Sequence, residues 1–354
     1  SVDDALNLKS YTTTQRDALT SVAGDIIYNS TTSKVETYNG SAWEQAGGVE
    51  GVSIEYLVIA GGGGSGGGVP TLQAGGGGGA GGYRTNKTGQ TSGGGASAEP
   101  TLIVPKSTNI TVTVGAGGAA GPTATGSSDK MGGTGSSSVF GLVTSLGGGG
   151  GFEYYSTYTN SFNPNSPDVD NKAGKVGSGG GDSWLGSAVV LGVGRTGQGF
   201  NGGLGYSSGT IASAGGGGAG AVGGNASSGN GGAGGNGVSS DITGSATTRA
   251  GGGGGASSTG GSGGSGGGGA GTSAANSVGT AGTANTGGGA GGSRAGSSVG
   301  NVGGATGGSG IVILRYATAD ATITVGAGLT SSSATDGSDT VVTFTAGTGT
   351  VSFA

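Results

Sequence analysis

Two runs of β-branched and apolar residues stand far apart in a chain dominated by small residues. Residues 53–60 read Ser-Ile-Glu-Tyr-Leu-Val-Ile-Ala, and residues 310–316 read Gly-Ile-Val-Ile-Leu-Arg-Tyr. Runs of this kind with no breaker inside are typical of buried strands. We expect the two strands to pair and to close one domain. Shorter apolar runs at 101–105, 109–114 and 138–143 predict further strands of a modest sheet.

The first 50 residues have a different pattern. A short helical turn is predicted first, and residues 24–29 and 34–39 then follow as two β-like runs. Asn39-Gly40 is a strong turn signal, and Trp43 is expected to be the buried anchor of this hairpin. We assign residues 1–50 to an N-terminal attachment module built on a β-hairpin.

The last residues return to an ordinary β pattern. Residues 321–325 and 340–345 alternate between apolar and polar positions. Residues 350–353 are expected to complete a hairpin through Gly347. Residues 317–354 are therefore predicted to form a small C-terminal β element.

Between the two long strands the chain is rich in glycine. Glycine supplies 98 of the 354 residues and clusters in runs at 61–64, 75–79, 147–151, 215–218 and 251–255. An ordered glycine loses more conformational entropy than any other residue and brings no side chain to bury. Such a chain is either a flexible spacer or an architecture in which backbone packs directly on backbone.

The packed alternative has a defined geometry. Glycine-rich segments can form polyproline II helices with three residues per turn, and neighbouring helices can then bond through their backbones. Ser257-Ser258-Thr259 and Ala274-Ala275-Asn276 would turn the chain at the ends of the bundle. A long structureless connection inside one domain is uncommon, which favours packing over a flexible linker. The predicted fold is mainly β and irregular: for residues 53–316, a packed polyproline II sandwich closed by β-strands and flanked by small β modules.

Composition and charge exclude several classes of function. Charged residues make up 9% of the chain, the net charge is −5, and there is no cysteine or histidine. Disulfide frameworks, thiolate metal sites and histidine-based catalysis are therefore excluded, and the acidic balance argues against nucleic-acid binding. No apolar run is long enough to cross a membrane. The chain begins at Ser1 with no secretory leader, which leaves processing, truncation or an upstream segment open.

Carboxylate chemistry has weak support. A glycosidase needs two placed carboxylates. The pairs that could serve are Asp168 with Asp170, or Glu153 with Asp182. Scattered acidic residues are usually solvated surface groups, so we expect no enzyme activity. Asp168 and Asp170 could also hold calcium, but the EF-hand spacing is absent, and we expect no cofactor or metal.

An aromatic segment interrupts the glycine pattern at residues 152–165. Tyrosine offers a large, stiff contact area with a polar group, and loops on a rigid scaffold often carry binding. The alternative is that these rings cap the bundle or pack against a sister subunit. A second group surrounds Arg195, for which a small local core is the alternative. The candidate recognition residues of the two groups are Tyr154, Tyr155, Tyr158, Phe162, Asn163, Trp184 and Tyr206.

The order of several motifs resembles a known family. The motifs are Glu55–Ala60 running into Gly61–Gly64, then Gly81-Gly82-Tyr83-Arg84, Val112–Gly118, Leu146 followed by five glycines, and Ser309–Tyr316. Together they resemble the glycine-rich domain of bacteriophage tail fibres and tail-tip adhesins over about residues 53–316. Residues 10–45 separately resemble the short hairpin modules of phage structural proteins.

This resemblance implies a sandwich of polyproline II helices with variable loops at its tip that bind an outer-membrane receptor. Those adhesins are separate tip proteins, whereas this chain carries flanking β modules, so a place within a fibre or on a capsid is equally open. We expect a non-enzymatic, extracellular virion protein. Its expected partners are a host cell-surface glycan or outer-membrane protein, and other virion proteins through the N-terminal module, with the chain itself a homotrimer.

Two other functions stay open. One is a purely structural fibre-shaft or capsid-decorating protein without receptor binding. The other is an extracellular glycine-rich protein such as an ice-binding protein, although the flat threonine array with a period of three that ice binding needs is not visible in the sequence.

Overall fold

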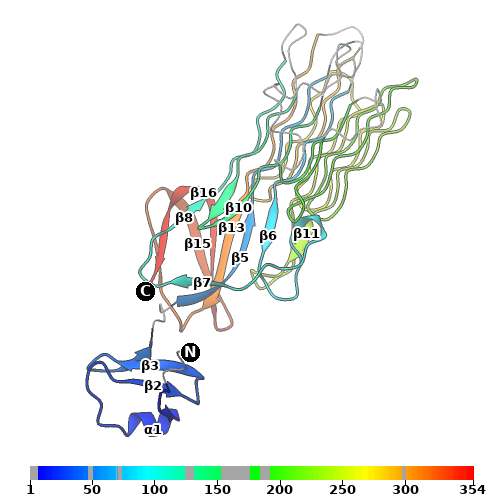
Figure 1. Ribbon diagram of the computed structural model, residues 1–354. Coiled ribbons are helices and arrows are strands. Elements are labelled where there is room, and N and C mark those ends of the chain that lie inside the picture. The colour runs from blue at the N-terminus through cyan, green and yellow to red at the C-terminus, as the bar shows by residue number, and fades with distance from the viewer. Residues whose placement is uncertain are drawn as a thin grey trace, which may run out of the picture. The chain divides into compact units, whose positions relative to one another are not determined.

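The computed structural model of the chain describes residues 7–46, 51–68, 70, 74–123, 131–152, 176–183, 192–296 and 300–354. The chain divides into two compact units, Ser1–Gly51 and Val52–Ala354. The fold is mainly β, and its described residues include one five-residue α-helix and one short 3-10 helix (Figure 1). The first unit has a four-stranded sheet, and the second has a ten-stranded sheet and a two-stranded hairpin.

The first unit is a small sheet with one helix. Its strands follow the spatial order β1-β2-β3-β4, with β1 parallel to β2 and the other pairs antiparallel. A capping box starts the helix, because Thr12 Oγ1 accepts from the Gln15 amide at 3.3 Å and Gln15 Oε1 accepts from the Thr12 amide at 2.9 Å. The predicted helical turn and hairpin are confirmed. The elements are β1 (Ser10–Tyr11), α1 (Thr13–Asp17), β2 (Ile26–Asn29), β3 (Lys34–Tyr38) and β4 (Trp43–Gln45).

The turn between β3 and β4 follows from one side chain. Asn39 Oδ1 accepts hydrogen bonds from the backbone amides of Ser41 and Ala42, both at 2.8 Å, which closes an Asx turn. Trp43 then pairs with Tyr38, and their ring centroids lie 5.4 Å apart. Trp43 is half-buried, so the expectation of a buried anchor is wrong: its ring packs on the neighbouring strand, and part of it stays in contact with solvent.

The second unit contains a larger, nearly closed antiparallel sheet. Its strands follow the order β10-β9-β8-β16-β13-β5-β6, with β14 and β15 also paired to β16 and β7 paired to β5. The elements of this unit are β5 (Gly51–Ile59), β6 (Tyr83–Thr85), η1 (Gly93–Gly95), β7 (Leu102–Pro105), β8 (Ile110–Thr113), β9 (Ser138–Phe140), β10 (Val143–Ser145), β11 (Val238–Ser240), β12 (Thr247–Arg249), β13 (Ile311–Ala317), β14 (Ile323–Val325), β15 (Leu329–Asp336) and β16 (Asp339–Phe353).

The predicted pairing of the two long apolar strands is confirmed. β5 and β13 are antiparallel neighbours, with Ile59 opposite Ile311 and Glu55 opposite Arg315. After Ile59 the chain contributes β6 to β10 to the same sheet, passes through the remaining glycine-rich segments and returns beside β5 at Ile311. This pair therefore fixes both ends of the glycine-rich region to the sheet.

The predicted hairpin through Gly347 is wrong. β16 is one fifteen-residue strand, and its first half pairs with β13 and β15 while its second half pairs with β8 and β14. Gly347 has φ +96°, a left-handed conformation that glycine adopts without strain, and it lies where the strand passes from one set of partners to the other. Residues 317–354 thus contribute three strands to the main sheet.

Apolar side chains cover both faces of β5 and β13. Alternate residues of a strand point to opposite faces, so Tyr56 and Val58 join one cluster with Phe140 and Phe344. Leu57 and Ile59 join a second cluster on the other face, where Ile242 packs against them. Strands buried on both sides explain why the sequence there is continuously apolar.

Polar side chains bring the ends of the sheet together. Arg84 on β6 donates from Nη1 to the Thr144 carbonyl of β10 at 3.1 Å, and Ser145 Oγ of β10 donates to the Val58 carbonyl at 2.7 Å. Arg84 also forms a two-point ion pair with Glu99, with both N···O distances 2.6 Å. These contacts, rather than a continuous backbone ladder, complete the barrel-like sheet.

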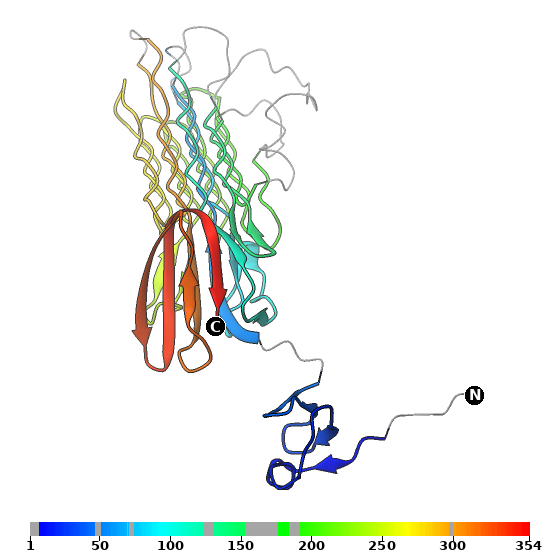
Figure 2. The same cartoon turned by 90° about the vertical axis from the view of Figure 1, so that its left-hand side faces the viewer.

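The glycine-rich segments run outward from this sheet and lie side by side (Figure 2). Their backbone amides donate to three neighbouring segments in turn, and this rotation of partners repeats every three residues. In residues 75–82, every third amide donates to the same neighbour. Residues 75, 78 and 81 donate to 293, 290 and 287; residues 76, 79 and 82 donate to 152, 149 and 146; residues 77 and 80 donate to 214 and 217.

The same rotation appears in residues 61–68. Amides 62, 65 and 68 donate to the carbonyls of 308, 305 and 302, and amides 61 and 64 donate to those of 136 and 133. Amides 63 and 66 donate to the carbonyls of 79 and 76. The buried amides named here therefore each have a partner, as an interior requires, and this segment is bonded to three neighbours.

Candidate functional site

Six of the seven predicted recognition residues lie outside the described residues. These are Tyr154, Tyr155, Tyr158, Phe162, Asn163 and Trp184. The same holds for Glu153, Asp168 and Asp170, the carboxylates considered for catalysis or calcium. Tyr206 is described and half-buried.

Tyr206 opens a tight turn between two glycine-rich segments. Its backbone amide donates to the Ala212 carbonyl at 2.8 Å, and the Ala212 amide donates back to Tyr206 at 3.0 Å. Gly209 at the tip has φ +89°. Phe200, in the segment that leads to this turn, lies beside Gly95 of the 3-10 turn next to the sheet.

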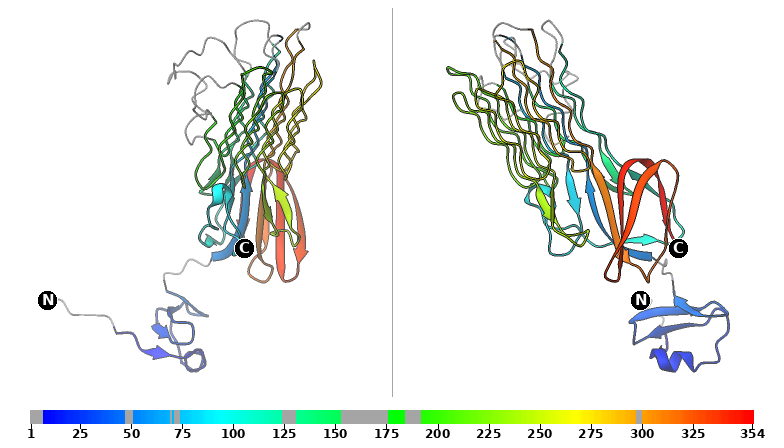
Figure 3. Two further views of the ribbon diagram at one scale, coloured as in Figure 1. Left: turned by 90° about the vertical axis from the view of Figure 1, so that its right-hand side faces the viewer. Right: turned by 180° about the vertical axis from the view of Figure 1, so that it is seen from behind.

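Among the described residues, four turns gather at the end of the glycine-rich segments that lies away from the sheet (Figures 1, 2 and 3). We call the turns 206–212, 226–230, 257–260 and 272–277 the distal loops. Hydrogen bonds join the first three: Ser257 Oγ donates to the Ile211 carbonyl at 3.2 Å, and Asn230 forms a parallel bridge with Thr259. The expectation that Ser257-Ser258-Thr259 and Ala274-Ala275-Asn276 turn the chain agrees with this arrangement.

Arg294 ties the fourth distal loop to the third. Its Nη1 donates to the Ser273 carbonyl at 2.6 Å, and its Nη2 lies 3.3 Å from Ser258 Oγ. Nearby, the Gly296 amide donates to Asn276 Oδ1 at 2.7 Å. The role of Arg294 was not predicted, although its sequence carries a signal: it is the only charged residue between 253 and 296.

The distal loops are polar but almost uncharged. Serine, threonine and asparagine supply their side chains, and none of the four contains Asp, Glu, Lys or Arg. Exposed positions include Ser208, Thr210, Ser228 and Thr259. Hydroxyl and amide groups both donate and accept hydrogen bonds. The loops therefore present hydrogen-bonding groups, and Arg294, between the third and fourth loops, is a charged group beside them.

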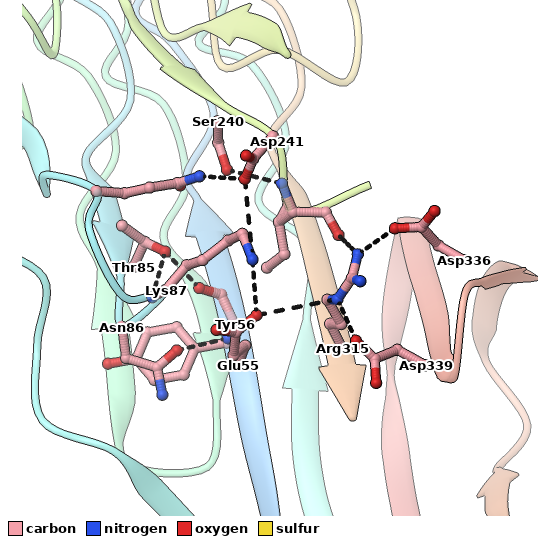
Figure 4. A network of polar contacts seen from close by, with 12 residues as sticks. Glu55, Tyr56, Thr85, Asn86, Lys87, Ser240, Asp241, Arg315, Asp336 and Asp339 are labelled. Carbon is pink, nitrogen blue, oxygen red and sulfur yellow. Dashed lines mark hydrogen bonds and ion pairs between the residues drawn. The ribbon is translucent and has the colours of Figure 1, made fainter. Parts of the chain in front are cut away.

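A charged network occupies the opposite end of the glycine-rich segments, beside the sheet (Figure 4). Lys87 Nζ lies 3.0 Å from Glu55 Oε2 and 3.8 Å from Asp241 Oδ1. Gln90 Nε2 donates to Asp241 at 2.5 Å. The network thus joins β5, the segment after β6 and the β11–β12 hairpin.

Arg315 extends this network to the C-terminal strands. It donates from Nη1 to Asp336 at 2.6 Å and from Nε to Asp339 at 2.8 Å. The same Nη1 lies 3.3 Å from the Ile242 carbonyl in the β11–β12 hairpin. Each of the two cations, Lys87 and Arg315, lies within 4.0 Å of at least two carboxylates, so we interpret the network as a structural clamp that holds the hairpin on the sheet.

Two described features bear on the carboxylate chemistry considered above, a shallow groove and the buried Asp182. A shallow groove of about 190 Å³ beside Arg315 has one carboxylate, Asp336, among hydroxyl and apolar residues. Asp182 is buried, at 4% exposure, and accepts a 2.7 Å hydrogen bond from the Ser183 amide. No group of three or more acidic, cysteine or histidine residues within the described ranges is placed to hold a metal ion. Among the same residues, no helix is long and apolar enough to span a bilayer.

A protein-family match covers most of the chain. The glycine-rich domain family matches residues 32–317, a span that begins in the first unit and ends with β13. The chain belongs to this family. No curated protein and no solved structure matches the chain.

Proposed function

We propose that this chain is a non-enzymatic bacteriophage virion protein, a tail fibre or adhesin that displays recognition loops on a rigid glycine-rich scaffold. The gathering of the distal loops at one end of backbone-bonded segments carries this proposal. Loops held by a rigid framework lose little entropy when they bind. The order of sequence motifs that resembles phage adhesins supplies the virion context.

The scaffold in this proposal is a sandwich of polyproline II helices. A helix of this type has three residues per turn and no internal hydrogen bonds, so each turn points one amide toward each of three neighbours. The rotation of partners along residues 61–68 and 75–82 has this period. Glycine is required because a side chain would separate the helices.

The proposed partner is a neutral part of the host cell surface, either a glycan or an outer-membrane protein. The distal loops offer many hydroxyl and amide groups and no net charge, which favours hydrogen bonding over ionic attraction. Tyr206 adds one aromatic ring to this surface. The aromatic residues of 152–165 and Trp184 stay predicted contributors to the contact with the partner. In this proposal the first unit attaches to other virion proteins and the chain is a homotrimer.

Adsorption of virions to host cells tests the proposal. Ser228→Lys and Thr259→Lys place a charge on exposed positions of two distal loops, and Ser245→Lys makes the same change on an exposed turn next to the sheet. We expect the distal variants to lower the adsorption rate by about tenfold or more, because an unpaired charge opposes a neutral interface. The Ser245 variant should match the unchanged virion.

A deletion of residues 152–170 tests the predicted aromatic contributors in the same assay. If intact virions carrying either distal variant or this deletion adsorb at the unchanged rate, receptor recognition by these loops is wrong. The purely structural function would then be favoured.

A further inference from the structure

Asparagine is followed directly by glycine at four places in the chain, and the structure describes all four. Such a pair can modify itself, because the glycine amide nitrogen can attack the side-chain carbonyl carbon of the asparagine, and glycine has no side chain to obstruct the approach. An amide that is already held in a hydrogen bond must give up that bond before it can react. The four pairs are Asn39-Gly40, Asn201-Gly202, Asn230-Gly231 and Asn236-Gly237.

The hydrogen bonding of the glycine amide separates the first pair from the other three. The Gly40 amide donates to no described residue. The other three amides are bonded within the glycine-rich region: Gly202 donates to the Gly192 carbonyl at 3.0 Å, Gly231 to that of Thr259 at 2.8 Å, and Gly237 to that of Ser265 at 2.8 Å. Exposure does not make this distinction, since Asn230 and Asn236 are exposed as Asn39 is.

The turn around Asn39 also supplies donors to the carbonyl under attack. Asn39 Oδ1 accepts hydrogen bonds from the amides of Ser41 and Ala42 at 2.8 Å and from the Ser41 hydroxyl at 2.9 Å. Negative charge develops on this oxygen when a nucleophile bonds to the carbonyl carbon, and donors already in place stabilise it. Residues 39–42 therefore hold an unbonded amide nucleophile, its target carbonyl and three donors to the carbonyl oxygen.

We propose that Asn39 is a self-modification site, at which the chain deamidates without an enzyme. The Gly40 amide nitrogen gives its proton to solvent base and bonds to Cγ of Asn39. The Cγ–Nδ2 bond then breaks, and the nitrogen leaves as ammonia with a proton taken from water. One water molecule opens the resulting succinimide ring, which leaves aspartate or isoaspartate at position 39. This chemistry does not rest on the proposed function of the chain.

The product changes the charge of the β3–β4 turn. Asn39 Nδ2 donates to Glu44 Oε1 at 2.5 Å, and deamidation replaces this donor with a carboxylate oxygen. Two carboxylates at such a distance repel each other, and isoaspartate also lengthens the backbone by one carbon atom. We therefore expect the pairing of β3 with β4 to loosen, so that amides 43–45 exchange faster in the converted chain than in the fresh chain. Unchanged exchange there would overturn this effect on the turn.

Peptide mass spectrometry of the folded full chain tests the site itself. The chain is aged in mildly alkaline buffer made with heavy-oxygen water, so each converted asparagine takes up one labelled oxygen atom. We expect Asn39 to convert roughly tenfold faster or more than the other three, because their glycine amides must first lose a hydrogen bond. Asn230 and Asn236 are the matched controls, since both are exposed. Equal conversion at the four sites, or faster conversion at either control, would overturn the proposal.

The same measurement on the unfolded chain shows whether the fold causes the preference. Guanidinium chloride removes the hydrogen bonds that hold Gly202, Gly231 and Gly237, so the four sites should then convert at similar rates. Similar rates in denaturant together with fast conversion of Asn39 in the folded chain support the proposal. If Asn39 keeps its full lead in denaturant, its neighbours in sequence cause the preference, and the assignment to the turn geometry is wrong.

Discussion

At the scale of single residues, the second unit depends on places where no side chain fits. A Cβ added to Gly78 would overlap the carbonyl group of Gly63, and one added to Gly63 would overlap that of Gly149. These are backbone atoms and cannot rotate away. Glycine is therefore required here by close approach between segments, while its left-handed conformations matter at turns such as Gly209.

Alanine substitution tests this requirement. Gly78→Ala forces two bonded segments apart, and we expect a loss of about 3 kcal/mol or more in the free energy of unfolding. Gly300→Ala is the matched control, since nothing lies within 4 Å of the added methyl group and the change reduces the freedom of the unfolded chain. Thermal unfolding of both variants measures the difference. Equal stability of the two would contradict direct backbone packing.

The sequence predicts that many glycines are needed but not which ones. Glycine runs are visible, and the entropy argument identifies two alternatives. The contacts that decide between them join residues such as Gly62 and Gly308, and no local pattern specifies such partners. For the same reason, the position of Arg294 between two distal loops could not be derived from its neighbours in sequence.

At the scale of elements, strands with a strong apolar pattern were predictable and polar strands were not. β5 and β13 have continuous β-branched runs because both of their faces are buried. β15 was missed because six of its eight residues are exposed and its centre reads Thr-Ser-Ser-Ser-Ala-Thr, with no alternation to detect. Its partner β16 supplies the buried apolar residues of this hairpin. Only one of the two strands therefore has a hydrophobic pattern that the sequence reveals.

The β11–β12 hairpin depends on Arg315, which gives an element-scale prediction. Arg315→Ala removes the donor to Ile242 and leaves Asp336 and Asp339 unpaired, so we expect a loss of about 1–3 kcal/mol. Hydrogen exchange should accelerate in residues 238–249 before it does in β13. Lys106→Ala removes a charge from the turn after β7 and serves as the control. Unchanged exchange in the Arg315 variant would show that apolar packing of Ile242 alone holds the hairpin.

At the scale of the whole chain, the two units rely on different forces. The first has a polar centre, with Ile27 as the one buried apolar side chain among residues 7–46, whereas the second combines two apolar clusters with a large region of backbone bonding. The composition of the chain changes near the division between the two units, at residues 50–53. The predicted recognition residues, Tyr206 included, stay predictions.

Amide exchange of the full chain tests whether the glycine-rich region is ordered as a unit. The amides of residues 61–64 each donate to another segment at 2.8–3.0 Å, so we expect slow exchange comparable to that of β5. Exposed residues of the distal loops, such as Ser228, should exchange rapidly by comparison. Rapid exchange throughout residues 61–64 and 75–82 would refute the packed scaffold and support the flexible-spacer alternative.

The bonding between glycine segments has a consequence for how stability varies with temperature. Unfolding an ordinary domain exposes apolar surface and raises the heat capacity by about 12–15 cal/mol/K per residue, whereas exposing polar surface lowers it. The glycine segments bury mainly peptide groups, so their contribution to this heat-capacity change is small or negative. The stability of the scaffold is therefore expected to follow a flatter curve, with less weakening in the cold than a domain of equal size held by an apolar core.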